Sequence, residues 1–222
     1  MVMVMNRRKV LRHCSALGLA LAASHGFAQS PNTKPGKSDK RIVVLGDSLS
    51  AEYGLARGSG WVALLEKRLA DQKITASVIN ASISGDTTSG GRARLDALLH
   101  EQKPTLLVIE LGANDMLRGL PVADARANLL AMIHAAKAAH AKVLLIGMQV
   151  PPNFGRAYIE SYQTLYAEVA RNEKVGLVPF LLKGVADQTD MDAWFQADRI
   201  HPLARAHPII LDNVWPEVKR LL

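Results

Sequence analysis

Residues 41–49 read Arg-Ile-Val-Val-Leu-Gly-Asp-Ser-Leu, and this stretch decides the fold. Residues 42–45 are four aliphatic side chains in a row, and Gly46 follows them. A short, wholly apolar run is typical of a strand buried on both faces, as in parallel sheets that are covered by helices. The stretch therefore predicts the first strand of an α/β domain, with Asp47 and Ser48 at its carboxyl end.

The rest of the chain alternates between short aliphatic runs and longer amphipathic stretches. The runs predict four more buried strands, at residues 76–79, 106–111, 143–146 and 175–178. The amphipathic stretches predict helices at residues 61–70, 88–100, 122–140, 157–172 and 206–222. This order predicts one domain over residues 41–222, in which a five-stranded parallel sheet lies between two layers of helices as a three-layer α/β/α sandwich.

The positive charge of the chain is concentrated at its N-terminus. The 222 residues include 27 Lys and Arg against 20 Asp and Glu, a net charge of +7 that could indicate nucleic-acid binding. Residues 1–41 hold eight of these basic residues and one acidic residue, whereas residues 42–222 hold 19 of each. The predicted domain is therefore neutral overall, and no nucleic-acid partner is expected.

Residues 1–28 have the pattern of a cleavable export signal. Arg7-Arg8-Lys9 is a positive segment, residues 14–23 are apolar or small, and Gly26-Phe27-Ala28 places small residues at positions −3 and −1. We expect cleavage after Ala28. The alternative is an anchor that stays attached, but the apolar segment is shorter than the ~20 residues that span a bilayer. The arginine pair leaves both the general secretory route and the twin-arginine route open.

Cleavage at this point has three consequences for the mature protein. It begins with a flexible polar leader at residues 29–40, it lies in the periplasm or outside the cell, and it has no stable membrane anchor. The single cysteine, Cys14, is removed with the signal, which excludes catalysis by a thiolate. One cysteine also excludes a disulfide framework and a cysteine-rich zinc site.

Polar residues and glycines follow several of the predicted strands. Ser48 follows the first strand, Gly85 lies in the segment after the second, and Asn114 comes shortly after the third. Asp198 and His201 lie in a segment beyond the fifth. Parallel α/β sheets bind ligands at the carboxyl ends of their strands. We therefore expect these five residues to meet in one site.

The same residues carry a resemblance to a known family. The strings VLGDSLSAEYGL (44–55), VINASISGDTTSGG (78–91), VIELGANDMLRG (108–119) and DRIHP (198–202) resemble the four sequence blocks of the SGNH, or GDSL, hydrolases. Within that family they look most similar to the branch of periplasmic thioesterase I/lysophospholipase enzymes and arylesterases. The resemblance covers residues 41–222 and implies a flavodoxin-like sheet.

The resemblance also implies a role for each residue. Ser48 would be the nucleophile, His201 its general base, and Asp198 the group that orients the imidazole. The Ser48 N–H, the Gly85 N–H and the Asn114 side-chain amide would form the oxyanion hole. Taken alone, Ser48 could equally cap a helix and His201 could lie at the surface. Gly85 and Asn114 could each be an ordinary turn residue.

Apolar residues near these positions predict an acyl or aryl site. Met116, Leu117 and Phe154 are expected to line it. No nucleotide-binding motif or metal-ligand cluster occurs, so we expect no cofactor and no metal. The expected protein is a monomeric esterase that hydrolyses aryl esters, acyl thioesters or lysophospholipids through an acyl-Ser48 intermediate.

Two other classes stay open on the sequence alone. Asp47, Asp86, Asn114, Asp115 and His201 could be the ligands of a metallophosphoesterase. The fold could also belong to a binding module without catalytic activity. In the esterase interpretation, we expect Asp86 to cap the following helix and Asp115 to brace its own turn.

Overall fold

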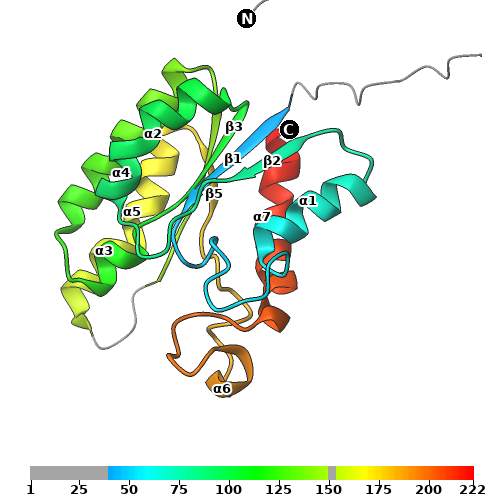
Figure 1. Cartoon of the computed structure of the whole chain (residues 1–222). Coiled ribbons are helices and arrows are strands. Elements are labelled where there is room, and N and C mark those ends of the chain that lie inside the picture. The colour runs from blue at the N-terminus through cyan, green and yellow to red at the C-terminus, as the bar shows by residue number, and fades with distance from the viewer. Residues whose placement is uncertain (1–39, 150–153) are drawn as a thin grey trace, which may run out of the picture. The chain divides into compact units, whose positions relative to one another are not determined.

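The computed structural model describes residues 40–149 and 154–222, and their fold is the predicted sandwich (Figure 1). Five parallel strands form one sheet in the order β2-β1-β3-β4-β5, which is the flavodoxin-like order. The strands are β1 (Arg41–Gly46), β2 (Ser77–Asn80), β3 (Leu106–Glu110), β4 (Lys142–Ile146) and β5 (Gly176–Val178). The predicted signal at residues 1–28 and the predicted leader at residues 29–40, apart from Lys40, lie outside the described residues.

Helices cover both faces of this sheet (Figure 1). One layer is made of α1 (Trp61–Asp71) and α7 (His207–Leu221), and the other of α2 (Thr88–Gln102), α4 (Val122–Ala138) and α5 (Arg156–Glu173). The predicted helices are confirmed, with ends that differ by one or two residues. Three short elements near the site were not predicted, because each is only a turn or so long: α3 (Ala113–Leu117), α6 (Met191–Trp194) and η2 (Ala204–Ala206).

The apolar run of β1 fills the core on both sides of the sheet. Ile42 and Val44 pack into the cluster beneath α1 and α7, and Val43 and Leu45 pack into the cluster beneath the other helices. All four side chains are fully buried. Each aliphatic side chain contributes roughly 1.5–3 kcal/mol on burial, so a polar residue at any of these positions would be costly.

β2 departs from the prediction of a strand buried on both faces. Its residues are half-buried or exposed, because β2 is an edge strand that pairs only with β1. The pairing joins Arg41 to Ser77 and Val44 to Asn80. The strand nevertheless delivers the segment that contains Gly85 to the same edge as Ser48.

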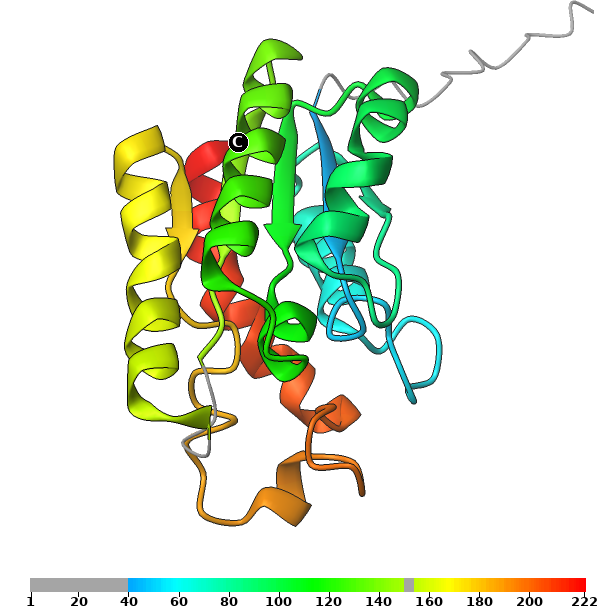
Figure 2. The same cartoon turned by 90° about the vertical axis from the view of Figure 1, so that its left-hand side faces the viewer.

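The carboxyl ends of the strands point to one edge of the sheet, where the connecting segments gather (Figure 2). β1 lies between β2 and β3. The chain therefore moves from β1 to one side of the sheet to form β2, and then crosses to the other side of β1 to form β3. Crevices at such a reversal are the usual ligand sites of open parallel sheets. Ser48 follows β1 and Asn114 follows β3, which places both residues at this crevice.

Among residues 40–149 and 154–222, no helix combines the length and the apolar character needed to cross a lipid bilayer.

Candidate active site

Ser48, His201 and Asp198 form a continuous hydrogen-bonded chain. Ser48 Oγ lies 2.8 Å from His201 Nε2, although 153 residues separate the two in sequence. His201 Nδ1 lies 2.6 Å from Asp198 Oδ2. The serine stands on the turn after β1, and the other two residues lie in the segment between α6 and η2. The structure therefore brings these three residues together.

The Asp198 carboxylate is held by its own turn. Its Oδ1 accepts hydrogen bonds from the N–H of Ile200 at 2.9 Å and the N–H of His201 at 3.0 Å. Partial burial alone would raise the pKa of Asp198, but the hydrogen bonds from the His201 backbone, the His201 ring and Ile200 lower it to about 2. Asp198 is thus a carboxylate at every pH at which the protein would work. A carboxylate in this position favours the His201 tautomer with a proton on Nδ1.

The segment that carries His201 is fixed at both ends. The N–H of Gln196 donates to the His201 carbonyl at 2.8 Å, and Phe195 forms an antiparallel bridge with Pro202. Arg199 adopts a left-handed backbone with φ 56° and pairs with Asp192 of α6 at 3.1 Å. These contacts present the imidazole to Ser48 from a short, tightly wound turn.

The three predicted oxyanion donors differ in how they are bonded within the protein. Gly85 has φ 80°, a conformation that glycine adopts readily, and its carbonyl accepts a hydrogen bond from Arg118 at 2.8 Å. Within the described part of the chain, the N–H groups of Ser48 and Gly85 donate no hydrogen bond to another protein group. Both backbone donors are therefore available to a negatively charged oxygen.

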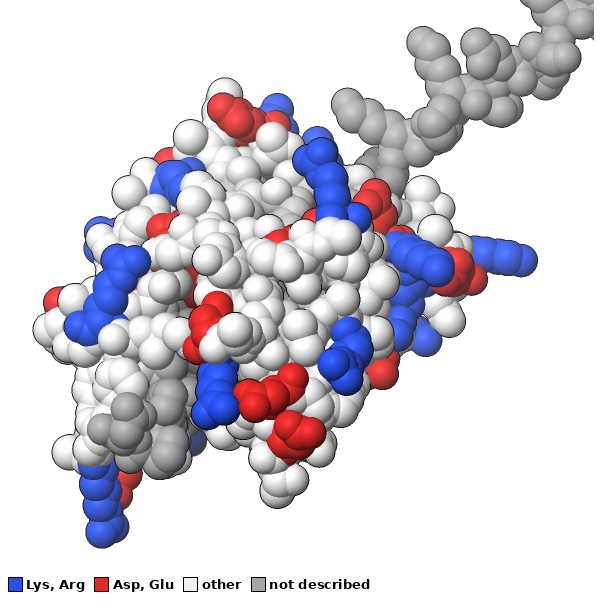
Figure 3. Space-filling model, turned by 60° about the horizontal axis from the view of Figure 1, so that its bottom comes forward, with Lys and Arg blue, Asp and Glu red and all other residues white. Residues whose placement is uncertain are grey.

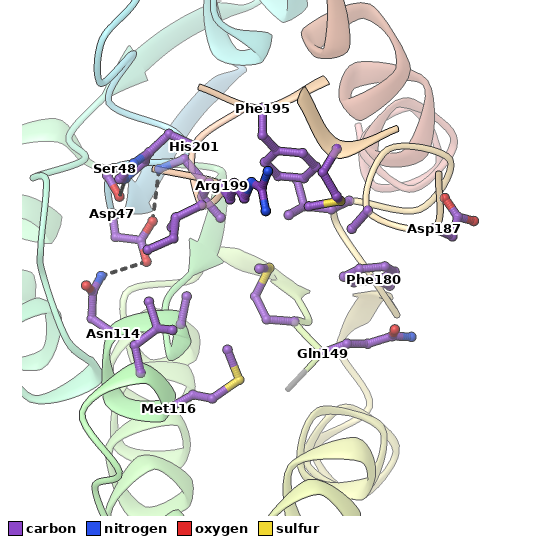
Figure 4. Close-up of a pocket in the computed structure, with 18 residues that line it drawn as sticks. Asp47, Ser48, Asn114, Met116, Gln149, Phe180, Asp187, Phe195, Arg199 and His201 are labelled. Carbon is purple, nitrogen blue, oxygen red and sulfur yellow. Dashed lines mark hydrogen bonds between the residues drawn. The ribbon is translucent and has the colours of Figure 1, made fainter. Parts of the chain in front are cut away.

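The third predicted donor, Asn114, is engaged within the protein. Its Nδ2 donates to Asp47 Oδ2 at 3.0 Å, as Figure 4 shows, and to Asp86 O at 2.9 Å. These two bonds use both N–H groups of the amide. They orient the amide beside the Ser48 turn, and an oxyanion would have to share or replace one of them.

Two buried carboxyl groups lie beneath the Ser48 turn. Burial raises the pKa of Asp47 to about 6, against the lowering effects of the Leu49 N–H, the His201 charge and the Asn114 amide. Burial and the neighbouring Asp47 charge raise the pKa of Glu110 well above its usual value. Glu110 was not among the residues predicted from the sequence. The sequence feature that could have indicated Glu110 is a charged residue at the end of an otherwise aliphatic strand.

The two secondary expectations for Asp86 and Asp115 were wrong. Thr87, not Asp86, caps α2, because its Oγ1 accepts from the Gly90 N–H at 3.1 Å. Asp86 instead pairs with Arg94 at 2.8 Å. Asp115 does not brace its own turn but accepts from the Thr88 N–H at 2.8 Å and from the Thr88 hydroxyl.

These contacts bear on the metallophosphoesterase alternative. Two of the carboxylates it needs, those of Asp86 and Asp115, are turned toward Arg94 and Thr88 rather than toward a common centre. In residues 40–149 and 154–222, no group of three or more His, Cys, Asp or Glu side chains is arranged to hold a metal ion.

An apolar cavity of about 590 Å³ begins at Ser48 and His201 (Figure 4). Its apolar wall comes from Met116, Leu117, Met148, Phe180, Leu182, Ala186, Met191 and Phe195. The structure thus places the predicted Met116 and Leu117 in the lining. It does not place Phe154 there, since that ring stacks on Tyr158 with centroids 6.0 Å apart. The exposed Tyr53 ring lies beside the imidazole, with its centroid 4.2 Å from that of His201.

The face that contains this edge of the sheet has no large area of one charge. Lys and Arg are interspersed there with Asp and Glu, and uncharged surface separates them (Figure 3). The exposed large apolar side chains of the described residues lie on segments at this edge: Tyr53, Ile83, Leu117, Leu120 and Ile200. The surroundings of the cavity are therefore suited to an uncharged or amphiphilic ligand.

Comparisons with known proteins agree with the geometry. Residues 44–209 match the model of the GDSL-like lipase/acylhydrolase family. The chain is 55% identical to the esterase TesA of Pseudomonas aeruginosa over 181 residues, which is 82% of this chain and 89% of TesA. It is 40% identical to thioesterase 1/protease 1/lysophospholipase L1 of Escherichia coli (strain K12) over 181 residues, 82% of this chain and 84% of that protein.

A solved structure gives the same result. The esterase EstA from Pseudoalteromonas sp., in a crystal structure inhibited by monoethylphosphonate, superimposes with a TM-score of 0.77 at 38% identity. The match covers 82% of this chain and 98% of EstA. In sequence and in fold, this chain belongs to the GDSL-like lipase/acylhydrolase family.

Proposed function

We propose that this protein is an esterase that hydrolyses carboxylic esters and thioesters through an acyl-enzyme on Ser48. The observation that carries the proposal is the chain of hydrogen bonds from Ser48 Oγ through His201 to Asp198, at the mouth of an apolar cavity. A nucleophile in contact with a base, and a base in contact with an orienting carboxylate, is the arrangement that acyl transfer requires.

Acylation begins when His201 Nε2 takes the proton of Ser48 Oγ. The oxygen attacks the carbonyl carbon, and a tetrahedral intermediate forms with a negative charge on the former carbonyl oxygen. His201 then gives the proton to the departing alcohol or thiol as the bond to that group breaks. Ser48 is left as an ester of the acyl group. A water molecule then gives a proton to His201 while its oxygen attacks the acyl carbon, and a second tetrahedral intermediate forms. Its bond to Ser48 Oγ breaks, His201 returns the proton to that oxygen, and the carboxylic acid is released.

The intermediate oxygen is stabilised by three donors. Two of the donors are the N–H groups of Ser48 and Gly85, which are free of other hydrogen bonds among the described residues. The third is the Asn114 amide, after the oxyanion replaces one of its present acceptors. The two backbone donors are unoccupied and need no change of partner when the charge develops, whereas the Asn114 amide must give up one of its present bonds.

The cavity favours acyl or aryl groups as substrates. Its apolar lining and its volume of about 590 Å³ suit a hydrocarbon chain or an aromatic ring, with the reacting carbonyl at Ser48. Within the family, the named activities of the relatives include esterase, thioesterase and lysophospholipase. We include aryl esters, acyl thioesters and lysophospholipids among the small-molecule substrates of this chain.

We further propose that the enzyme acts after export, as a monomer in the periplasm or outside the cell. The support is the sequence of residues 1–28, with its positive segment, its short apolar segment and the Gly26-Phe27-Ala28 site. Mass determination of the mature protein tests this proposal. A first residue of Gln29 is expected, and an N-terminus within residues 1–20 would contradict cleavage.

A substrate panel tests the proposed activity. The purified enzyme is assayed with p-nitrophenyl acetate, octanoate and dodecanoate, with acyl-coenzyme A, and with a lysophospholipid. Activity should survive EDTA and be lost on treatment with a phosphonate that reacts with serine. Activity that EDTA removed, with no effect of the phosphonate, would favour the metallophosphoesterase alternative. No hydrolysis of any member of the panel would favour the binding module.

A further inference from the structure

Glu110 is a fully buried carboxyl group directly beneath the turn that carries Ser48. It is the last residue of β3, and its position in the sheet is opposite Gly46, two residues before Ser48. The proposed reaction assigns it no step. Burial of a carboxyl group costs free energy of folding unless hydrogen bonds or a proton compensate for the loss of water. A carboxyl group in the core therefore indicates a structural or functional role.

One oxygen of Glu110 holds both sides of the Ser48 turn. Oε2 accepts a hydrogen bond from Ser50 Oγ at 2.7 Å and another from the Asp47 N–H at 3.3 Å. Ser50 Oγ in turn accepts from the Trp61 indole at 3.2 Å. Residues 47 and 50 flank the nucleophile, so a shift of this single oxygen would move the turn from both ends.

Gly46 leaves the space that this arrangement needs. A Cβ at residue 46 would lie 2.8 Å from Ser50 Oγ and 2.9 Å from Glu110 Oε2. Both distances are shorter than side-chain carbons tolerate. The glycine before Asp47 therefore lets the β1 backbone approach the Glu110 carboxyl closely, which is a packing requirement separate from any flexibility of the turn.

We infer that Glu110 is a positioning residue for the nucleophile turn: through Ser50 and Asp47 its carboxyl group sets where Ser48 Oγ lies relative to His201. The inference rests on the proposed function, since it assumes that Ser48 is the nucleophile. Asp47 extends the effect, because its Oδ2 accepts from the Asn114 amide. A displaced turn would therefore misplace the nucleophile and one oxyanion donor together.

The surroundings of Glu110 favour its uncharged form. The titratable groups that face it are Asp47 on the β1 turn and Tyr166 on α5, and His201 lies beyond Asp47. Burial raises the pKa of Glu110, and the Asp47 charge raises it further. The second oxygen, Oε1, is buried without a hydrogen-bond partner in the described residues, so a proton there would leave Oε2 free to accept. A glutamine can reproduce this uncharged acceptor.

Three variants test the inference: Glu110→Gln, which keeps the shape and an acceptor, Glu110→Leu, which keeps the volume alone, and Ser50→Ala, which removes one donor. Each is assayed for kcat and KM with p-nitrophenyl butyrate, per active site counted by phosphonate titration, from pH 6 to pH 10. Displacements of about 1 Å cost on the order of 100-fold in rate. We expect Glu110→Leu to lose about 100-fold in kcat, Ser50→Ala about 10-fold, and Glu110→Gln less than about threefold, all with little change in KM.

The pH profile and a matched control separate positioning from stability. As the pH rises toward the raised pKa of Glu110, kcat should fall in the wild type but not in Glu110→Gln, because a charged Glu110 would repel the Asp47 carboxylate on the turn. Leu99→Ala, a core truncation on α2, should lower the melting temperature without changing kcat per active site. If Glu110→Leu does not fold, Ser50→Ala decides. Wild-type kcat per active site in Ser50→Ala, or in Glu110→Leu, would overturn the inference. Full activity in Ser48→Ala would instead overturn the proposed function, so the two failures are distinguishable.

Discussion

Asn114 and Asp47, which follow two neighbouring strands of the sheet, are joined by a hydrogen bond of 3.0 Å from the Asn114 amide to Asp47 Oδ2. A second bond from the same amide, to Asp86 O, completes its donor capacity. The amide is thus held in place next to Ser48 before any substrate arrives. An oxyanion that replaces one of the two acceptors would meet an amide that is already oriented, and oriented donors account for much of the rate enhancement of acyl-transfer enzymes.

Removal of this donor should slow the chemical step. Asn114→Ala should lower kcat about 10²–10³-fold, equivalent to about 3–4 kcal/mol of transition-state stabilisation, with KM changed far less. Steady-state kinetics with p-nitrophenyl butyrate measure both constants. Asn172→Ala, an exposed asparagine on α5, is the matched control and should leave both unchanged. An Asn114→Ala enzyme with wild-type kcat would contradict the assignment of the oxyanion hole.

The orientation of His201 should depend on the charge of Asp198. Asp198→Asn keeps the size of the side chain but turns an N–H toward His201 Nδ1, which favours the wrong tautomer. We expect kcat to fall by roughly 10²–10⁴-fold. Asp96→Asn removes an exposed carboxylate on α2, outside the site, and it should keep activity within about twofold. Equal losses in the two variants would argue against a specific role for Asp198.

The low pKa of Asp198 predicts the pH range in which this residue stops stabilising the folded state. A carboxyl group whose pKa is about 2 when folded and near 3.9 when unfolded stabilises the folded state above pH 4 and loses that effect as the pH falls toward 2. Between pH 2.5 and pH 4, the melting temperature of the wild type should therefore fall more steeply than that of Asp198→Asn. Thermal unfolding monitored by circular dichroism measures the two slopes, and parallel slopes would contradict the low pKa.

Glu110 should have the opposite effect on stability. Its pKa is raised in the folded state, so its contribution is complete below the unfolded value near 4.3 and is lost as the pH rises through the folded value. The melting temperature of Glu110→Gln minus that of the wild type should increase as the pH rises above the unfolded value toward the folded one. Asp47, with a pKa of about 6, contributes a similar loss between pH 4 and pH 6 in both proteins. A temperature difference that does not change with pH would show that Glu110 is charged throughout.

Much of this molecule could be predicted from its sequence because most of its strands contain short, uninterrupted aliphatic runs. Such runs are found where helices cover both faces of a sheet, and the chemistry-bearing residues follow them at the carboxyl edge. β2 was mispredicted as fully buried because its composition does not reveal that it lies at the edge of the sheet. The partners of Asp86 and Asp115 were also wrong, because Arg94 and Thr88 reach them through tertiary contacts that no local spacing encodes.

The lining of the cavity shows the same limit. Met116 and Leu117 belong to α3, beside Asn114, so proximity in sequence predicted them correctly. Phe180, Leu182, Ala186 and Phe195 come from the segment between β5 and η2, whose path over the site depends on the assembled fold. Phe154 lies outside the lining because its ring packs on Tyr158 of α5.

This lining gives a prediction for acyl-chain length. Ala186 lines the cavity next to Asp187, which Figure 4 shows across from Ser48. Ala186→Phe should therefore fill this distal part and exclude the end of a long chain. Each methylene that stays in water costs about 0.8 kcal/mol, so the loss of two lowers kcat/KM about 10-fold. The ratio of kcat/KM for p-nitrophenyl dodecanoate to that for the acetate should fall by that factor, with the acetate value nearly unchanged. An equal fall for both esters would place the acyl group elsewhere.

The central claim, an acyl group carried on Ser48, has one direct test. The enzyme is mixed with a p-nitrophenyl ester, quenched with acid within milliseconds, digested, and analysed by mass spectrometry alongside Ser48→Ala. We predict a burst of p-nitrophenol of about one equivalent per chain when deacylation is the slow step, and an acyl mass on the peptide that contains Ser48. The burst and the adduct should both be absent from the alanine variant. An acyl adduct on another residue, or a Ser48→Ala enzyme with wild-type turnover, would contradict the account.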